Sequence, residues 1–349
     1  MDLLLPTEIV THIFLSLPTV TSALSLASTC RSFHAIFHSS KRLLILQHSA
    51  KIEFGPLDDI VQLVTHNASQ PAHFRRDVPL SDALIRQLVK AGHVARQWED
   101  IYMYRKWKHD YVARRLLSTF ERFKLRRAIY RLWLFDRAFH NIAHVRYART
   151  RLEVVRERAA LLHNYTTSEL AEMLDVHAII RDVVANDLCP SNGRLRRKYQ
   201  ARYPETAHQP LFSIHLNYPP TASRFIASDN QYHNSTLASS KYHAQQQRWQ
   251  ENSTHPAEFG LEGWGDDIGH YYVVEDMMKL DPEQILYLRE HCPAKSQVEA
   301  YVAGMGMWFE NNGETFSETL AFVIKQRGGE MEELKAAVEA EEVGVVVSD

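Results

Sequence analysis

The sequence has 349 residues and only three cysteines, Cys30, Cys189 and Cys292, which lie far apart. Cysteines in this number and spacing predict neither a disulfide framework nor a zinc cluster, and they suit a reducing compartment. No apolar run approaches the roughly 20 residues that cross a bilayer. The first residues lack the basic leader of a secretory signal and include Asp2 and Glu8. We therefore expect a soluble protein without membrane contact, located in the cytoplasm, the nucleus or both.

Strong helix breakers are also rare in the middle of the chain. Between Leu80 and Cys189 there is no proline and a single glycine, Gly92. Alanine, leucine, arginine and glutamate, which favour helices, are abundant there. We also find no internal repeat, so leucine-rich repeats and propeller blades are not expected. This composition predicts a mainly α fold, with a helix ending near Gly92 and others at 94–108, 111–148, 150–163 and from 167 or 168 to about 186.

Residues 200–257 differ in composition from what precedes them. They are rich in Gln, Asn, Ser, His and Tyr, which predicts an irregular polar insertion or linker. Further helices are expected after it, with Asp281 as the cap of one that begins at Pro282, and then a frayed tail from Val343. The predicted organisation is an N-terminal helical unit and an irregular multi-helix domain interrupted by the insertion, with boundaries at 1–48, 49–199, 200–257 and 258–349.

Charge is distributed unevenly, although the net charge is only −2. Residues 96–158 hold 17 Lys/Arg and 7 Asp/Glu, a local charge of +10, whereas residues 258–349 hold 6 and 20, a local charge of −14. We expect the basic and acidic helices to pack near each other. The basic segment also interleaves arginine with aromatic residues, a mixture that can bind nucleic acid. Pairing within the protein is the favoured interpretation, with nucleic-acid binding (unlikely) and recognition of an acidic protein substrate as alternatives.

The most specific pattern lies in the first forty residues. Pro6 is placed to open a helix, and Glu8 falls in its first turn, near the positive end of the helix dipole. Apolar residues then recur at helical spacing until Pro18 ends the helix. Thr21 or Ser22 is expected to cap a second helix, and a third follows. The pattern predicts two or three short helices packed as a compact unit.

This stretch resembles an F-box, of the type found in fungal F-box proteins. The resemblance rests on the order and spacing of Leu5, Pro6, Glu8, Ile9, Ile13, Leu17, Leu24, Leu26, Cys30 and Phe33. An F-box binds the adaptor Skp1, and through it a cullin, so the resemblance implies that these ten residues form an adaptor-binding surface. It further implies a non-catalytic, substrate-recruiting subunit of an SCF-type ubiquitin ligase, whose C-terminal helical domain binds an unidentified protein substrate. The alternative is an ordinary helical hairpin within a scaffold or nucleic-acid-associated protein.

A second candidate site is the glycine-rich segment from Gly260 to Gly269. Trp264 lies among the glycines, which would let a partner approach closely, and tryptophan is enriched at binding hot spots. Trp264, with Asp266 and Asp267, is therefore the candidate substrate-binding site. Inward packing of the indole is the alternative.

Two groups of residues have the chemistry but not the spacing of a metal site. His140 and His144 are four residues apart, and only two such ligands do not make a site. The cluster of acidic residues and histidine in the glycine-rich segment lacks the alternating oxygen ligands of a calcium loop. No catalytic residue, cofactor or metal is therefore predicted. The second group consists of Glu262, Asp266, Asp267 and His270.

Overall fold

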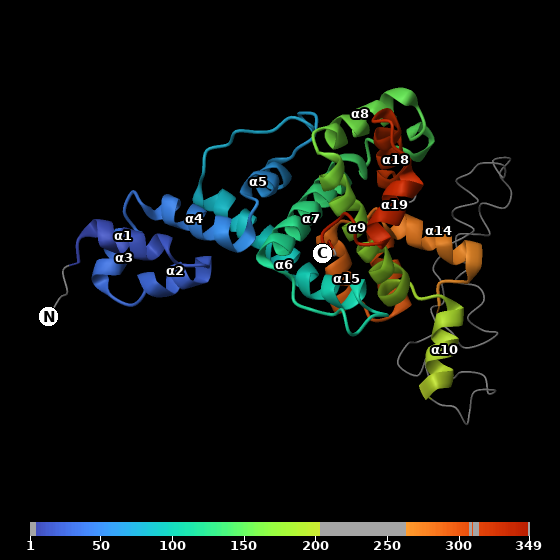
Figure 1. The fold of residues 1–349 in the computed structure, drawn as a ribbon, viewed down its shortest axis with the longest axis horizontal. Coiled ribbons are helices and arrows are strands. Elements are labelled where there is room, and N and C mark those ends of the chain that lie inside the picture. The colour runs from blue at the N-terminus through green and yellow to red at the C-terminus, as the bar shows by residue number, and fades with distance from the viewer. Residues whose placement is uncertain (1–4, 203–262, 307–308, 310–313, 348–349) are drawn as a thin grey trace. The chain divides into compact units, whose positions relative to one another are not determined.

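A computed structural model of the chain describes residues 5–202, 263–306, 309 and 314–347 (Figure 1). Within these ranges the fold is mainly α, as predicted, and contains no strand. The polar insertion predicted at 200–257 lies outside the described residues, except for the three residues that end a helix at its start. The chain divides into two compact units, which are described separately below: Met1–Ala138 with Ala160–Val176 and Ile324–Asp349, and Phe139–Ala159 with His177–Val323.

Unit 1 begins with three short helices that pack on a fourth (Figure 1). The fourth and fifth helices pack in turn on a helix of 25 residues. These elements are α1 (Thr7–Leu15), α2 (Val20–Ala27), α3 (Arg31–Phe37), α4 (Arg42–Phe54), α5 (Leu57–Thr65) and α6 (Asp82–Lys106).

Helix α6 continues through Gly92, where the sequence predicted an end. A Cβ atom at position 92 would lie 2.3 Å from the ring of Phe54 in α4. The glycine therefore permits a close approach of two helices. Its cost to helix stability, about 1 kcal/mol relative to alanine, is offset because the Phe54 ring packs into the space that a side chain would fill.

The basic helix α7 (Thr119–Phe139) is shorter than the predicted 111–148. Its start is set by a reciprocal cap, in which the Glu121 carboxylate accepts the Ser118 N–H at 2.7 Å and the Ser118 hydroxyl accepts the Glu121 N–H at 3.2 Å. Buried aromatic residues of α6 and α7, among them Trp98, Tyr130 and Trp133, fill the centre of the unit.

The last described residues, 343–347, were expected to fray but are packed in unit 1. Val345 is fully buried, and its N–H donates to the Asp175 carboxylate at 3.2 Å. That carboxylate also accepts a hydrogen bond from the Tyr102 hydroxyl at 2.6 Å and pairs with Lys106 at 3.0 Å. The tail is held because a buried acceptor binds its backbone, which no local sequence signal shows.

Helices α8 (Leu152–His163), α9 (Thr167–Val183) and α18 (Phe316–Gln326) contribute residues to both units, and α19 (Met331–Glu339) belongs to unit 1. Unit 2 contains α10 (Asn192–Arg202), α14 (Asp267–Met277), α15 (Pro282–His291) and α16 (Lys295–Gly304). Asp281 caps α15 as predicted, in a reciprocal pair with Gln284. None of the described helices is both long and apolar enough to cross a membrane.

Candidate functional site

Local signals form the three N-terminal helices. Helix α1 follows Pro6 directly, and Pro18 lies after its end. The Thr19 hydroxyl accepts the Ser22 N–H at 3.0 Å and caps α2, so the cap precedes the two residues expected from the sequence. The Cys30 sulfur accepts the N–H of Phe33, the third residue of α3, at 3.5 Å. Each helix is therefore started by a residue suited to that position.

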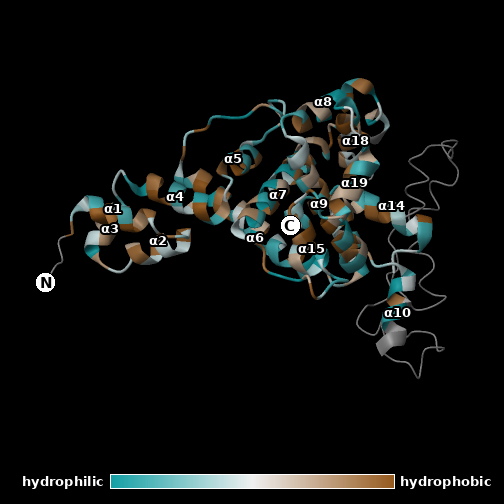
Figure 2. Cartoon of the chain, viewed as in Figure 1, coloured by the Kyte–Doolittle hydropathy of each residue, from teal (hydrophilic) through white to brown (hydrophobic). Residues whose placement is uncertain are grey.

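One face of these helices forms a small core. Phe14 and Phe37 are almost fully buried, with ring centroids 5.7 Å apart. Val10 of α1 and Ala23 and Ala27 of α2 are buried with them. Figure 2 shows that apolar and polar residues both occur along α1 to α4. The apolar residues of α1 do not all point to this core.

The ten residues of the predicted adaptor-binding surface lie outside that core. Leu5, Ile9 and Leu24 are 42%, 48% and 48% exposed. The core of these helices is formed by Phe14 and its buried neighbours without these three side chains, so the three are available to a partner. None of the ten is buried: Leu5, Pro6, Glu8, Ile9, Leu24 and Cys30 are exposed, and Ile13, Leu17, Leu26 and Phe33 are partly exposed.

The glycine-rich candidate site has a different environment. Trp264 is 1% exposed, so its indole packs inward, as the alternative interpretation predicted, and does not offer a binding surface. The backbone N–H of Trp264 donates to the Pro190 carbonyl at 3.0 Å, and the Gly265 carbonyl accepts the Asn192 N–H at 3.0 Å. The Lys295 ammonium lies 5.0 Å from the centre of the indole. Two irregular segments far apart in the sequence are thus joined around Trp264.

Asp266 and Asp267, in contrast, are exposed. The Asp266 carboxylate accepts the Gly193 N–H at 2.8 Å and so helps to join the same two segments. Asp267 begins α14 with a φ of 49°, a conformation uncommon for a residue with a side chain. Both carboxylates reach the surface, but without an exposed tryptophan beside them.

The histidines considered as metal ligands have other contacts. His140 is buried, and its Nε2 lies 3.2 Å from the Thr315 hydroxyl. His144 lies 3.9 Å from Glu157. Glu262 is outside the described residues. Among the residues that the structure describes, no group of three or more His, Cys, Asp or Glu side chains could hold a metal ion.

The arginines of α7 pair with carboxylates inside unit 1. Arg126 lies 2.5 Å from Glu99 of α6, and Arg127 lies 2.7 Å from Glu172 of α9. Arg131 pairs with a carboxylate of α5 in the same way. The predicted partner was the acidic C-terminal block, but these three arginines pair with carboxylates that precede it in the sequence. In unit 2, a basic residue of the 96–158 segment does meet that block, since Arg149 forms an ion pair with Glu318.

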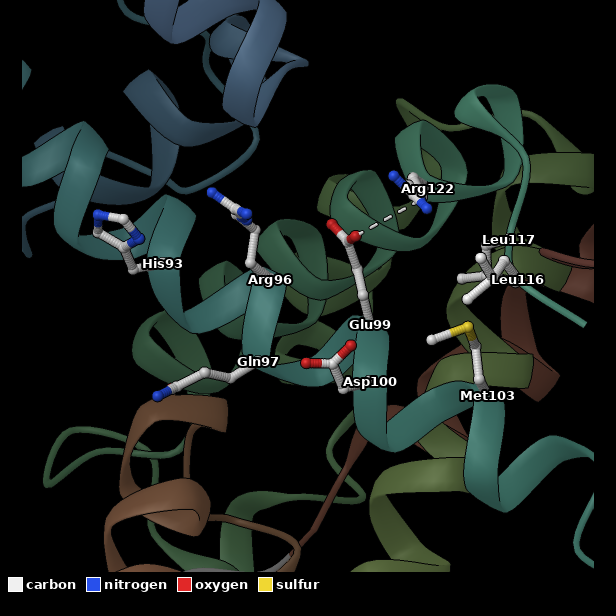
Figure 3. A pocket seen from close by; sticks show the side chains of 9 residues that line it. All are labelled: His93, Arg96, Gln97, Glu99, Asp100, Met103, Leu116, Leu117 and Arg122. Carbon is white, nitrogen blue, oxygen red and sulfur yellow. Dashed lines mark ion pairs between the residues drawn. The ribbon is translucent and has the colours of Figure 1, made fainter. Parts of the chain in front are cut away.

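Unit 1 also contains a cavity of about 450 Å³ that sequence reasoning missed (Figure 3). One wall is a stripe of α6, and the others come from the segment before α7 and from α7 itself. Residues three or four apart share a helix face, so the sequence could have grouped these α6 residues. It could not have shown which segment lies opposite them. The residues that line the cavity include His93, Arg96, Asp100, Met103, Leu116 and Arg122.

Comparison with known proteins locates a family match at the N-terminal helices. The model of the F-box-like family matches residues 3–43. No curated protein matches the chain, and no solved structure matches it. The match spans α1, α2 and α3 and ends as α4 begins.

Proposed function

We propose, from the premise that this chain is an F-box protein, that it recruits a protein substrate to an SCF-type ubiquitin ligase. The F-box-like domain suggests a Skp1-binding adaptor role. The remaining helices would bind the substrate, and a cullin would be reached through Skp1. The chain would act in the cytoplasm, the nucleus or both.

The observation that carries this proposal is the division of faces on α1 and α2. Phe14 and Ala23 are fully buried, whereas Ile9 and Leu24 are about half exposed. A hairpin that served only as part of its own core would bury the apolar residues on both faces. Covering one exposed leucine or isoleucine is worth about 1.5–3 kcal/mol, so a few such side chains can anchor a partner.

In this proposal the chain catalyses nothing itself. It holds a substrate near the ubiquitin-charged enzyme, and the gain in rate comes from a high effective concentration. Such a role requires two binding surfaces on one chain. The first is the exposed face of α1 to α3.

The nucleic-acid alternative loses its main support in the structure. A protein binds a phosphate backbone through several cations that are free to displace counterions. Arg126, Arg127 and Arg131 are instead engaged with carboxylates of the protein. The basic composition of 96–158 therefore does not translate into an equally basic free surface.

Titration of the purified full-length chain with Skp1 tests the proposal. Leu5→Ala combined with Ile9→Ala should weaken the complex at least about tenfold, because two apolar anchors are lost. The matched control is Ile142→Ala with Leu152→Ala, two apolar residues that are 80% and 51% exposed outside the F-box-like domain. The control should bind Skp1 as the wild type does.

Circular dichroism should show the same helicity for both double variants. If the Leu5/Ile9 variant is folded and binds Skp1 with unchanged affinity, the assignment of this surface is wrong. If the wild-type chain does not bind Skp1 at all, the adaptor role itself fails.

A further inference from the structure

The cavity of unit 1 has an apolar end and a charged end. Figure 3 shows Met103 of α6 close to Leu116 and Leu117 of the segment before α7, with His93 and Gln97 towards the other end. Leu117 is buried, whereas Leu116 is 73% exposed and forms an open wall. A bulky apolar side chain from a partner would fit between Met103 and Leu116.

The segment that carries Leu116 is held in place by local contacts. The Arg115 guanidinium contacts both carboxylate oxygens of Glu121. This hydrogen-bonded arginine lowers the pKa of Glu121 to about 2, so the pair is ionised at neutral pH. Because the same carboxylate caps α7 through Ser118, the wall is fixed before any partner arrives.

Exposed apolar side chains continue beyond the cavity along this segment. Tyr104, Tyr111, Val112 and Phe120 are 62%, 72%, 97% and 65% exposed. Tyr104 and Tyr111 both lie beside the Arg114 guanidinium, and exposed apolar residues that lie together indicate an interaction surface better than isolated ones do. We call Met103, Tyr104 and residues 111–122 the α6–α7 surface.

Two arginines of this surface carry positive charge that the carboxylates of the described residues do not fully balance. The Arg114 guanidinium lies 5.1 Å and 4.9 Å from the rings of Tyr104 and Tyr111. It donates to the Trp107 carbonyl at 3.5 Å, and its contacts among the described residues include no carboxylate. Arg122 lies 3.9 Å from Glu99, whose carboxylate is already contacted by a second arginine at 2.5 Å. A carboxylate brought by a partner would be attracted to both guanidiniums, and Arg is well suited to bind it.

We propose that the α6–α7 surface binds an acidic segment of a protein substrate that carries a bulky apolar side chain. The apolar side chain enters between Met103 and Leu116, and flanking carboxylates meet Arg114 and Arg122. This rests on the proposed function, since it supplies the second binding surface of a substrate receptor. Asp100 of α6, which Figure 3 shows between Gln97 and Met103, disfavours acidic groups beside it and so orients the segment.

The charges argue for a protein and against RNA as the occupant. A nucleic acid offers a phosphate at every nucleotide and needs several free cations along its path. The other arginines nearby are committed to carboxylates, as for Arg96 with Glu53 at 2.7 Å and Arg115 with Glu121 at 2.5 Å. A surface where Arg114 has no carboxylate partner and Arg122 shares Glu99 with Arg126, beside an apolar slot, fits one or two carboxylates next to an apolar residue.

A random peptide library displayed on phage and selected on the full-length chain alone tests this inference. Selected peptides should share Asp or Glu beside Phe, Leu, Ile, Trp or Met. Their synthetic forms should bind at least about tenfold more weakly to Leu116→Asp combined with Arg122→Glu. Asp100→Asn should strengthen binding about twofold, because it removes a like charge.

The matched control is Arg86→Glu with Leu152→Asp, which alters an exposed arginine of α6 and an apolar residue that is 51% exposed. It should bind the peptides normally, and both double variants should bind Skp1 normally. Peptides rich in Lys or Arg, binding that ignores the Leu116/Arg122 variant, or homopolymer RNA binding that the variant abolishes would each overturn the inference. If the wild-type chain binds the peptides but does not bind Skp1, the proposed function alone is overturned.

Discussion

Glu53 of α4 and Arg96 of α6 form an ion pair with 2.7 Å between carboxylate and guanidinium. The other carboxylate oxygen of Glu53 accepts the N–H of Val20, the first residue of α2, at 2.9 Å. One buried carboxylate thus connects the F-box-like helices to the helix that forms the floor of the cavity. Within unit 1, the surface proposed for Skp1 and the surface proposed for substrate are joined by this residue.

Replacing Glu53 should loosen that connection. Glu53→Ala leaves the Val20 N–H without its acceptor, and we expect a loss of about 1–3 kcal/mol in the free energy of unfolding. Hydrogen exchange at the start of α2 should rise accordingly. Glu53→Gln keeps an acceptor for Val20 and should cost less. Equal exchange in wild type and Glu53→Ala would show that the contact does not hold α2.

Trp264 should behave as a core residue. Trp264→Ala removes a side chain that is 1% exposed, and we expect a loss of about 3–5 kcal/mol, measured by urea unfolding. Ile268→Ala, at a neighbouring position that is 73% exposed, serves as the control and should change stability little. If Trp264→Ala leaves the free energy of unfolding unchanged, the indole would again be a candidate for substrate contact.

The packing of the C-terminal segment leads to a third prediction. Val345→Ala removes buried methyl groups and should cost about 2 kcal/mol. Val347→Ala, at a position that is 40% exposed, should cost much less, and the difference is read from thermal unfolding of the two variants. Equal stability of both variants would favour the frayed tail that the sequence suggested.

The buried His140 makes stability depend on pH. Burial lowers its pKa to about 3, although Glu314 opposes the shift. The unfolded chain, with a His pKa near 6.5, binds the proton more readily, so stability is full above about pH 6.5 and is lost as the pH falls towards 3. The loss from this residue approaches about 1.4 kcal/mol per pH unit.

Urea unfolding of wild type and His140→Gln at about pH 7.5 and about pH 5 measures this contribution. Glutamine can still hydrogen-bond the Thr315 hydroxyl but does not titrate. The wild type should lose at least about 1 kcal/mol more than the variant between the two pH values. Identical losses would show that His140 is not the group responsible.

Features that depend on neighbours within a few residues could be predicted from the sequence. The F-box pattern is a local spacing of apolar residues around Pro6 and Pro18, and it was recognisable without the fold. The start of α15 was likewise predicted correctly, because Asp281 and Pro282 act on the first turn that follows them. Helical content followed from composition in the same way.

Contacts between residues far apart in the sequence became known only from the tertiary structure. Gly92 looked like a helix end until Phe54 was placed against it, and the tail from Val343 looked free until Asp175 was found to accept its backbone. The buried and exposed faces of α1 could likewise be told apart only from the structure, in which Phe14 packs on Phe37 of α3 and Ile9 stays exposed. These outcomes depend on contacts between segments far apart in the chain, and neither helix propensity nor periodicity contains information about such contacts.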